Sequence, residues 1–367
     1  MRYAKRLAEL QARLGTKKVS VCLITRPTSV RYFCGFSGTE GSLLVSRRAV
    51  KFFTDFRYQE QAAAVLEGLP VELVIFKNKR EAYEKELGSL RIKRLGVEEE
   101  HISFALSKSL EQMGFELVGV QGVVDGIRAV KDSNEIKAIK RALGIAERAF
   151  RETVAELAPG MSELSAAAFL EYRMKSLGAE NPSFDTIVAS GARSSLPHGV
   201  ASAKRIGHEQ IVLFDFGCKY DGYCSDLTRV VYMCRKDAEM ERLRKIVIRA
   251  QRAAFEVIRP GVDVRKVDAA ARSVIEREGL GEFFGHGLGH GLGLDVHEYP
   301  RVSPLGKGKL KQGMVFTVEP GIYLEGRGGV RIEDVVVVTS SGCKLLSRLS
   351  RNGEVIPCIR HRTSKRG

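Results

Sequence analysis

A short turn near the middle of the chain constrains the fold more than any other segment. Asp221-Gly222 separates two strand-like runs rich in apolar residues, 211–220 and 223–233. An Asp-Gly pair between such runs is a strong signal for a two-residue β-hairpin turn. The sequence therefore predicts two antiparallel strands, and a two-residue turn allows one register only, in which Tyr220 lies opposite Tyr223.

The register of this hairpin brings two acidic residues together. Counting outward from the turn puts Asp215 opposite Thr228, and Asp226 lies two residues before Thr228. Because side chains on a strand alternate between faces, both carboxylates are predicted to point to the same face, within reach of shared cations. Two unrelated aspartates on a solvent-facing strand would explain this pair if it stood alone.

Three further residues complete a candidate metal site. His290 lies in GHGLGHGLGLDVHE, Glu319 ends a strand, and Glu333 follows the turn at 326–329. Four carboxylates and one imidazole match what two hard or borderline divalent cations need when they share a site. Two such ions activate a water and polarise the bond that it attacks, so a metal-dependent hydrolase is the leading interpretation. The complete set is Asp215, Asp226, His290, Glu319 and Glu333.

Histidines gather near these candidate ligands. His286 and His290 are four residues apart, but the glycines around them disfavour a helix, so the segment differs from the helical H-E-x-x-H zinc signature. Glycines here permit close backbone packing and let the imidazoles turn toward one cleft. His297 follows in the same segment, and His198 lies in SLPHG. A lone histidine is usually structural, whereas this concentration of four indicates a site.

Composition excludes several classes of protein. The chain has 367 residues, of which 44% are hydrophobic and 28% charged, which is typical of a soluble globular protein with two domains. No apolar run approaches the roughly 20 residues that cross a membrane, and no signal peptide is recognisable. The seven cysteines are scattered without a C-x-x-C pair, which predicts reduced thiols and a cytoplasmic location.

The net charge of +15 raises the question of nucleic acid. The excess is spread along the chain, with a local concentration after residue 343, and no tryptophan or aromatic–basic stacking motif accompanies it. A solvated basic surface explains this charge, so neither a specific nucleic-acid partner nor a membrane partner is expected. Weak non-specific binding of nucleic acid stays open.

The order of the expected elements predicts two domains of different class. Residues 1–124 alternate helix and strand, which predicts a small α/β domain, and Gly122 and Gly126 mark its boundary. Residues 125–350 contain four long helix patterns and several antiparallel strand signals, which predict an α+β domain with helices packed on a curved sheet. Residues 351–367 are expected to form a basic C-terminal tail.

Five motifs, taken in order, resemble those of the pita-bread metallopeptidases, in the creatinase-like branch that holds aminopeptidase P and prolidase. These motifs are LFDFG, SDLTR, GHGLGHGLGLDVHE, VEPGIY and VRIED, within residues 181–340. FSGTEGSLLV and FTDFRYQEQA look like the N-terminal domain of the same branch. The resemblance implies a pita-bread catalytic domain, a creatinase-like N-terminal domain and a homodimer.

The resemblance also implies a role for each candidate ligand. Asp215 would chelate one metal ion, His290 and Glu319 would bind the other, and Asp226 and Glu333 would bridge both. Glu319 would also serve as proton shuttle. Manganese is the expected metal, with cobalt, zinc and iron as alternatives.

Further residues near the metals are assigned by the same resemblance. His198 and His297 would line the pocket and stabilise the charge that develops on the scissile carbonyl. His286 and Arg331 resemble accessory active-site residues of the proline-directed members, and Tyr323 would support them.

The implied activity is removal of the N-terminal residue from peptides with proline second, by attack of a hydroxide that bridges two metals. An Xaa-Pro bond has no N–H, so peptidases that hydrogen-bond to this group lose a contact, whereas hydroxide attack needs none. An Xaa-Pro dipeptidase (prolidase) is the alternative, in which Arg331 would bind the C-terminal carboxylate of the substrate. A non-catalytic peptide- or protein-binding member of the fold also stays open.

Overall fold

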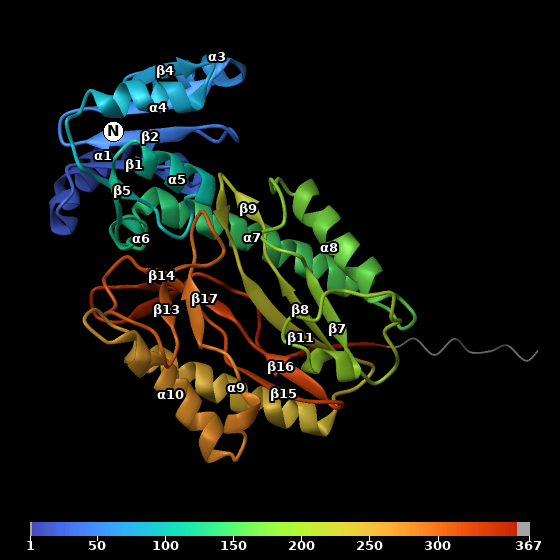
Figure 1. The fold of residues 1–367 in the computed structure, drawn as a ribbon. Coiled ribbons are helices and arrows are strands. Elements are labelled where there is room, and N and C mark those ends of the chain that lie inside the picture. Colours follow the sequence, from blue (N-terminus) through green and yellow to red (C-terminus); the bar gives the residue numbers. More distant parts are fainter. Residues whose placement is uncertain (1, 358–367) are drawn as a thin grey trace, which may run out of the picture. The chain divides into compact units, whose positions relative to one another are not determined.

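The computed structural model describes residues 2–357 of the chain (Figure 1). The chain divides into two compact units, Met1–Arg128 and Ala129–Gly367. Within the described residues, no helix combines the length and the apolar character needed to cross a membrane.

The first unit is built on one mixed sheet of six strands in the order β4-β3-β2-β1-β5-β6. β2 and β3 form an antiparallel hairpin, and β5 and β6 extend the sheet in parallel. Leu23, Leu44 and Phe53 from the sheet pack with Tyr83 in the core. The strands are β1 (Val21–Ile24), β2 (Ser42–Ser46), β3 (Val50–Asp55), β4 (Glu72–Phe76), β5 (Arg94–Val97) and β6 (Glu116–Gly119). The helices are α1 (Arg2–Arg13), α2 (Pro27–Cys34), α3 (Gln59–Leu66), α4 (Lys79–Gly88), α5 (Phe104–Gln112) and α6 (Gln121–Arg128).

The two glycines expected at the boundary lie inside a helix. Gly122 and Gly126 belong to α6, and the division between the units follows directly after Arg128. Val123, Val124 and Ile127 of this helix are buried. Their burial outweighs the cost of about 1 kcal/mol that each helical glycine carries.

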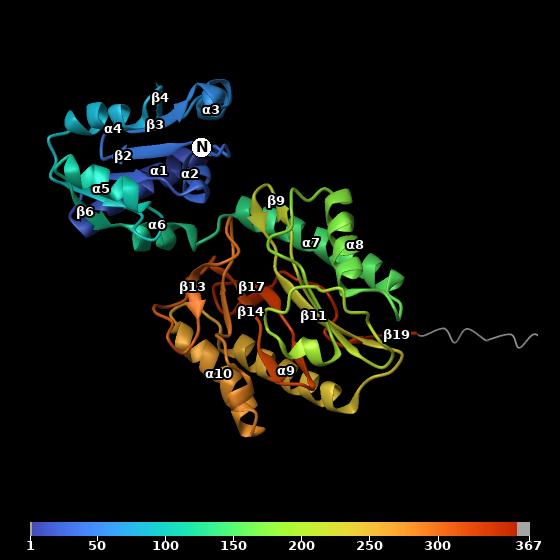
Figure 2. The same cartoon turned by 45° about the vertical axis from the view of Figure 1, so that its right-hand side comes forward.

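The second unit surrounds its strands with four long helices, and each of them begins with a side-chain cap. The Asp132 carboxylate accepts from the amides of Asn134 and Glu135, and Glu135 completes a capping box. Figures 1 and 2 show α7 and α8 beside β7, β8 and β11, and α9 and α10 along a different side of the unit. The helices are α7 (Ser133–Glu156), α8 (Glu163–Ser176), α9 (Ala238–Val257) and α10 (Val264–Arg277).

The strands of the second unit form a four-stranded sheet in the order β19-β11-β8-β7 and a five-stranded sheet in the order β13-β12-β14-β17-β18. Two short ribbons, β9-β10 and β15-β16, accompany them. The α+β architecture predicted for this part is confirmed. The strands are β7 (Ile187–Ser190), β8 (Ile211–Phe216), β9 (Lys219–Tyr220), β10 (Tyr223–Cys224), β11 (Leu227–Met233), β12 (Gly289–Gly291), β13 (Glu298–Val302), β14 (Val315–Val318), β15 (Gly321–Leu324), β16 (Gly328–Arg331), β17 (Asp334–Val338), β18 (Cys343–Leu345) and β19 (Glu354–Ile356).

The predicted hairpin is confirmed residue by residue. Tyr220 pairs with Tyr223, and Asp215 pairs with Thr228. Asp221 and Gly222 have φ angles of 48° and 75°, the left-handed values that a two-residue turn of this kind requires.

Two expectations about the C-terminal part and the cysteines need correction. Part of the expected tail is a strand, because β19 pairs in parallel with β11. Residues 358–367 lie outside the described residues. Cys234, expected to be a reduced thiol, is disulfide-bonded, whereas the other described cysteines are free thiols: Cys22, Cys34, Cys218, Cys224 and Cys343.

Candidate metal centre

The hairpin carries two of the acidic candidate ligands. Asp215 lies on β8, and Asp226 immediately precedes β11, where its side chain is 5% exposed. The charge of Asp215 contributes to raising the pKa of Asp226, so the two carboxylates lie close enough to interact electrostatically. The hairpin therefore supplies two of the five candidate ligands from one local element.

The remaining candidate ligands come from the five-stranded sheet and the chain beside it. His290 is the central residue of β12, and its Nε2 lies 3.2 Å from Glu319 Oε1 and 3.6 Å from Asp226 Oδ2. Asp226, His290 and Glu333 each offer a ligand atom within 4.8 Å of one another. Tertiary packing thus brings Glu319 and Glu333 to the hairpin carboxylates.

Glycine allows β12 to lie close to β14. A Cβ atom at Gly289 would overlap the carbonyl oxygen of Thr317, so any larger residue would push β12 away from β14. The Thr317 hydroxyl in turn accepts from the His290 amide and donates to Glu319 Oε1, at 3.1 Å and 3.0 Å. The glycine pattern around His290 therefore serves close packing, as predicted.

A buried arginine holds Asp215. Arg331 Nη2 donates to Asp215 Oδ2 at 2.5 Å, and Arg331 Nε donates to Thr228 Oγ1 at 3.0 Å. The Thr228 hydroxyl then donates to Glu333 Oε2 at 2.7 Å. Asp215 Oδ1 is buried and has no hydrogen-bond partner within the described part of the chain. One oxygen of Asp215 is thus anchored while the other remains available.

The crowded carboxylates perturb each other's protonation. Burial, followed by the negative charges of Glu333 and Asp215, raises the pKa of Asp226 well above its ordinary value. Burial and the charges of Glu319 and Asp215 do the same for the pKa of Glu333. Burial alone would raise the pKa of Glu319, but the hydrogen bond and charge of His290 lower it to about 2.

These residues fit divalent cations. Like-charged groups buried together are costly unless a cation compensates them, and the unpartnered Asp215 Oδ1 is an oxygen of the kind that a hard cation binds. An oxygen-rich donor set with one imidazole suits manganese, cobalt, iron or zinc. Asp226, His290 and Glu333 would form the nucleus of such a site, flanked by Asp215 and Glu319.

We expect the stability of the metal-free protein to fall as pH rises. A carboxyl whose folded pKa is raised contributes fully below its unfolded pKa of about 4, and this contribution is lost as pH rises through the folded value. Asp226 and Glu333 are both of this kind. Urea unfolding of the chelator-treated protein from pH 4 upward measures the loss. In Asp226→Asn, the free energy of unfolding should depend less on pH. An unchanged pH profile in this variant would contradict the expectation.

A hydrogen-bonded chain leads away from the carboxylates through Arg331. Its Nη1 donates to the Tyr323 hydroxyl at 2.8 Å, and that hydroxyl lies 2.9 Å from His286 Nε2. His286 Nδ1 lies 2.8 Å from the carbonyl oxygen of Gly287, so Nδ1 carries the proton and Nε2 accepts from Tyr323. Burial lowers the pKa of His286, consistent with this neutral form. His286 therefore acts on the site through Tyr323.

The two remaining predicted histidines lie at the exposed side of the cluster. The His297 ring centroid is 4.2 Å from that of His290. Burial lowers the pKa of His297, and the charges of His290 and His198 lower it further, which places His198 nearby. Both His198 and His297 are exposed and so accessible to a substrate.

Sequence reasoning missed two residues that organise the site. Thr228 bridges Arg331 and Glu333, as described above. Gln251, on the buried face of α9, donates through Nε2 to the carbonyl oxygens of Val318 and Ile332, at 2.9 Å and 3.2 Å. These two carbonyls directly precede Glu319 and Glu333. The signal for Gln251 was present in the sequence, as a polar residue at a core position of a long amphipathic helix.

Comparison with known proteins identifies the family. The model of metallopeptidase family M24 matches residues 137–340, and the model of the creatinase/prolidase N-terminal domain matches residues 6–130. An Xaa-Pro dipeptidase of Pyrococcus horikoshii is 39% identical over 337 residues, which cover 91% of this chain and 94% of that protein.

Solved structures agree over nearly the whole chain. An Xaa-Pro dipeptidase from Bacillus anthracis is 37% identical with a TM-score of 0.92, and an X-Pro aminopeptidase from Thermotoga maritima is 39% identical with a TM-score of 0.87. Each match covers 96% of this chain and 99% of the other. The fold, both domain matches and these similarities show that the chain belongs to metallopeptidase family M24, in the creatinase, aminopeptidase P and prolidase branch.

Proposed function

We propose that this metallopeptidase is an Xaa-Pro dipeptidase that uses two divalent metal ions. The observation that carries the proposal is the match over nearly the full length to an Xaa-Pro dipeptidase from Bacillus anthracis, with a TM-score of 0.92. The Pyrococcus horikoshii relative bears the same activity in its name. This replaces the aminopeptidase activity that was the first expectation from the sequence.

Five residues of this chain would hold the metals. They are Asp215, Asp226, His290, Glu319 and Glu333, of which Asp226, His290 and Glu333 offer ligand atoms within 4.8 Å of one another. When bound, two such ions supply an activated water and polarise the scissile carbonyl. Manganese is the metal we propose, and elemental analysis of the purified protein tests both the identity and the count of two.

The side chains around the ligands would hold and move protons. Glu319 would pass a proton toward the departing proline nitrogen, which cannot leave as an amide anion. His297 and His198 offer imidazole N–H groups at the exposed side of the cluster, where a scissile carbonyl would develop negative charge. Arg331 would keep Asp215 oriented.

The position of Arg331 changes how a dipeptide would be recognised. The sequence suggested that Arg331 binds the substrate carboxylate, but four of its five N–H groups are used inside the protein, by Asp215, Thr228, Tyr323 and the Pro197 carbonyl. A guanidinium so occupied positions the site and has little left for a substrate. We therefore assign Arg331 to the positioning of Asp215 rather than to the binding of the dipeptide carboxylate.

We expect kcat/KM for Ala-Pro to exceed that for Ala-Pro-Ala by about tenfold or more. A hydrogen bond to a charged group contributes about 1.5–3 kcal/mol, and the tripeptide moves its carboxylate away. Ala-Pro amide is the matched control, because it keeps the length and loses the charge. A preference for the tripeptide would favour the second candidate, an Xaa-Pro aminopeptidase, which the similarity to the Thermotoga maritima protein supports.

His198→Ala and His297→Ala are each expected to lower kcat by about a hundredfold or more without loss of metal. The reason is that each removes a donor to the developing charge and neither belongs to the proposed ligand set. His208→Ala is the control, because His208 contacts Cys234 Sγ at 3.4 Å, outside the cluster. Loss of one ion in either variant would show that a ligand has been misassigned.

Assembly and location belong to the same proposal. We propose a cytoplasmic homodimer that acts on proline-containing peptides. Light scattering of the metal-loaded protein measures the oligomeric state, and a monomer at micromolar concentration would contradict the dimer.

A further inference from the structure

The outer face of α9 carries a row of cations that the peptidase chemistry does not use. Arg242, Lys245, Arg249 and Arg252 are all exposed. Their spacings of three, four and three residues put them within an arc of about 80° on an α-helix, over a length of about 15 Å. The inner face of the same helix is apolar and carries Gln251. The basic row is therefore a separate feature of α9.

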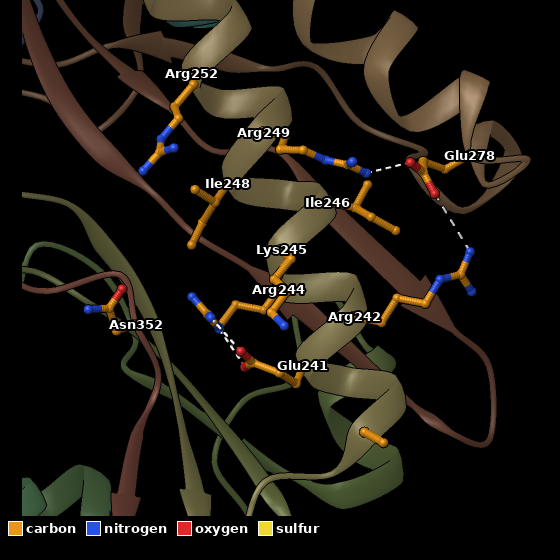
Figure 3. A pocket seen from close by; sticks show the side chains of 11 residues that line it. Glu241, Arg242, Arg244, Lys245, Ile246, Ile248, Arg249, Arg252, Glu278 and Asn352 are labelled. Carbon is orange, nitrogen blue, oxygen red and sulfur yellow. Dashed lines mark hydrogen bonds and ion pairs between the residues drawn. The ribbon is translucent and has the colours of Figure 1, made fainter.

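The row borders a cavity of about 650 Å³ on the surface of the second unit. Figure 3 shows the long basic side chains extending from α9, with Glu278 beyond the end of α10 on one side and Asn352 on the other. Arg244 also contributes to the lining. The residues that line the cavity include no aromatic side chain. We call this feature the α9 cavity.

The α9 cavity has more cations than the protein neutralises. Glu241 is bound by Arg244 at 2.6 Å. Glu278 is shared by two arginines of the row, lying 3.7 Å from Arg242 and in an ion pair with Arg249. Within residues 2–357, Lys245 and Arg252 have no hydrogen bond or ion pair. Five cations thus face two carboxylates, and the exposed ion pairs of Glu278 contribute only about 0–1 kcal/mol, so an anion can replace them.

The chemistry of the lining favours phosphate. Four of the five cations are arginines, whose planar fork matches two oxygens of one phosphate. A row about 15 Å long suits a flexible chain of regularly spaced charges, and the phosphate backbone of a nucleic-acid strand is such a chain. Without an aromatic side chain no base can stack, so only the backbone is recognised and sequence has no influence. This agrees with the absence of any specific nucleic-acid motif.

We propose that the α9 cavity binds the phosphate backbone of single-stranded nucleic acid without sequence preference. A single strand can follow one helix face and enter a shallow cavity, whereas the rigid curvature of a duplex keeps it outside. Four phosphate contacts, one for each member of the row, are expected. This binding is separate from peptide hydrolysis, because none of the row residues contacts the candidate metal centre.

The salt dependence of binding to a fluorescein-labelled oligo-dT of 20 nucleotides tests the proposal. With the metal-loaded protein, four contacts give a slope of log K against log salt of about −2.8, or about a 50-fold loss between 50 and 200 mM NaCl. Lys245→Gln/Arg252→Gln is expected to reduce the slope to about −1.4 and the loss to about sevenfold. Hydrolysis of Ala-Pro should be unchanged, which also reports correct folding.

A matched variant separates the α9 cavity from the general charge of the protein. Lys137→Gln/Lys140→Gln removes the same charge from the exposed face of α7 and should leave the slope unchanged. Equal slopes for the two double variants would overturn the proposal, because binding would then follow net charge alone. Equal displacement of the oligonucleotide by a poly-glutamate of the same charge would also overturn it, in favour of an acidic protein partner.

Discussion

Asp226→Asn is expected to lower kcat/KM by more than about a hundredfold while the protein remains folded. Changes to groups that merely support a metal ligand cost about 10–100-fold, and a bridging ligand should cost more. The amide keeps the shape of the side chain but removes a charge beside Glu333 and His290. Metal content, kcat/KM with Ala-Pro and the thermal midpoint measure the three parts of this expectation.

The same change should stabilise the metal-free protein. The pKa of Asp226 is raised by burial and by neighbouring carboxylates, so its ionisation opposes folding at neutral pH. Asp221→Asn is the matched control, because it removes a carboxylate from the turn of the same hairpin and asparagine tolerates the positive φ. Parent-like activity in Asp226→Asn would disprove the bridging role.

Arg331→Met is expected to lower the free energy of unfolding of the metal-free protein by about 3–5 kcal/mol. Removing one partner of a buried ion pair leaves the other charge uncompensated, and Arg331 is 3% exposed beside Asp215. The loss of stability is measured by urea unfolding at pH 8, because at this pH protonation of Asp215 neutralises its unpaired charge least. Manganese should recover part of it, since a cation at Asp215 replaces the lost charge.

Arg229→Met provides a comparison of the same type. Arg229 and Asp334 form a buried ion pair at 2.6 Å, and Asp334 is outside the proposed ligand set. This variant should be destabilised to a smaller degree, because Arg351 still pairs with Asp334 at 2.6 Å, and manganese should not recover the loss. Equal recovery in both variants would mean that the metal acts on global stability, and the proposed link between Arg331 and the metal centre would be wrong.

Local patterns in the sequence predicted most of the helices and strands and the part of the site that the hairpin builds. The D-x-x-E spacing at Asp132 is the pattern of the capping box that begins α7, and Asp221-Gly222 predicted the turn that aligns Asp215 with Thr228. Both signals act over a few residues, so backbone geometry alone suffices to interpret them. Gly122 and Gly126, which were expected at the domain boundary, lie within α6, because the apolar neighbours of these glycines are buried.

Contacts between distant segments were decided by tertiary structure alone. Nothing local in the sequence shows that Arg331 pairs with Asp215, that Gln251 joins the strands preceding Glu319 and Glu333, or that residues 354–356 complete a sheet with β11. Such pairings depend on how sheets and helices pack around a common core. The sequence thus determined which residues have metal-binding chemistry and where the chain turns. Packing determined which of their atoms meet, because one face of each strand must be buried against a partner that lies far away in the chain.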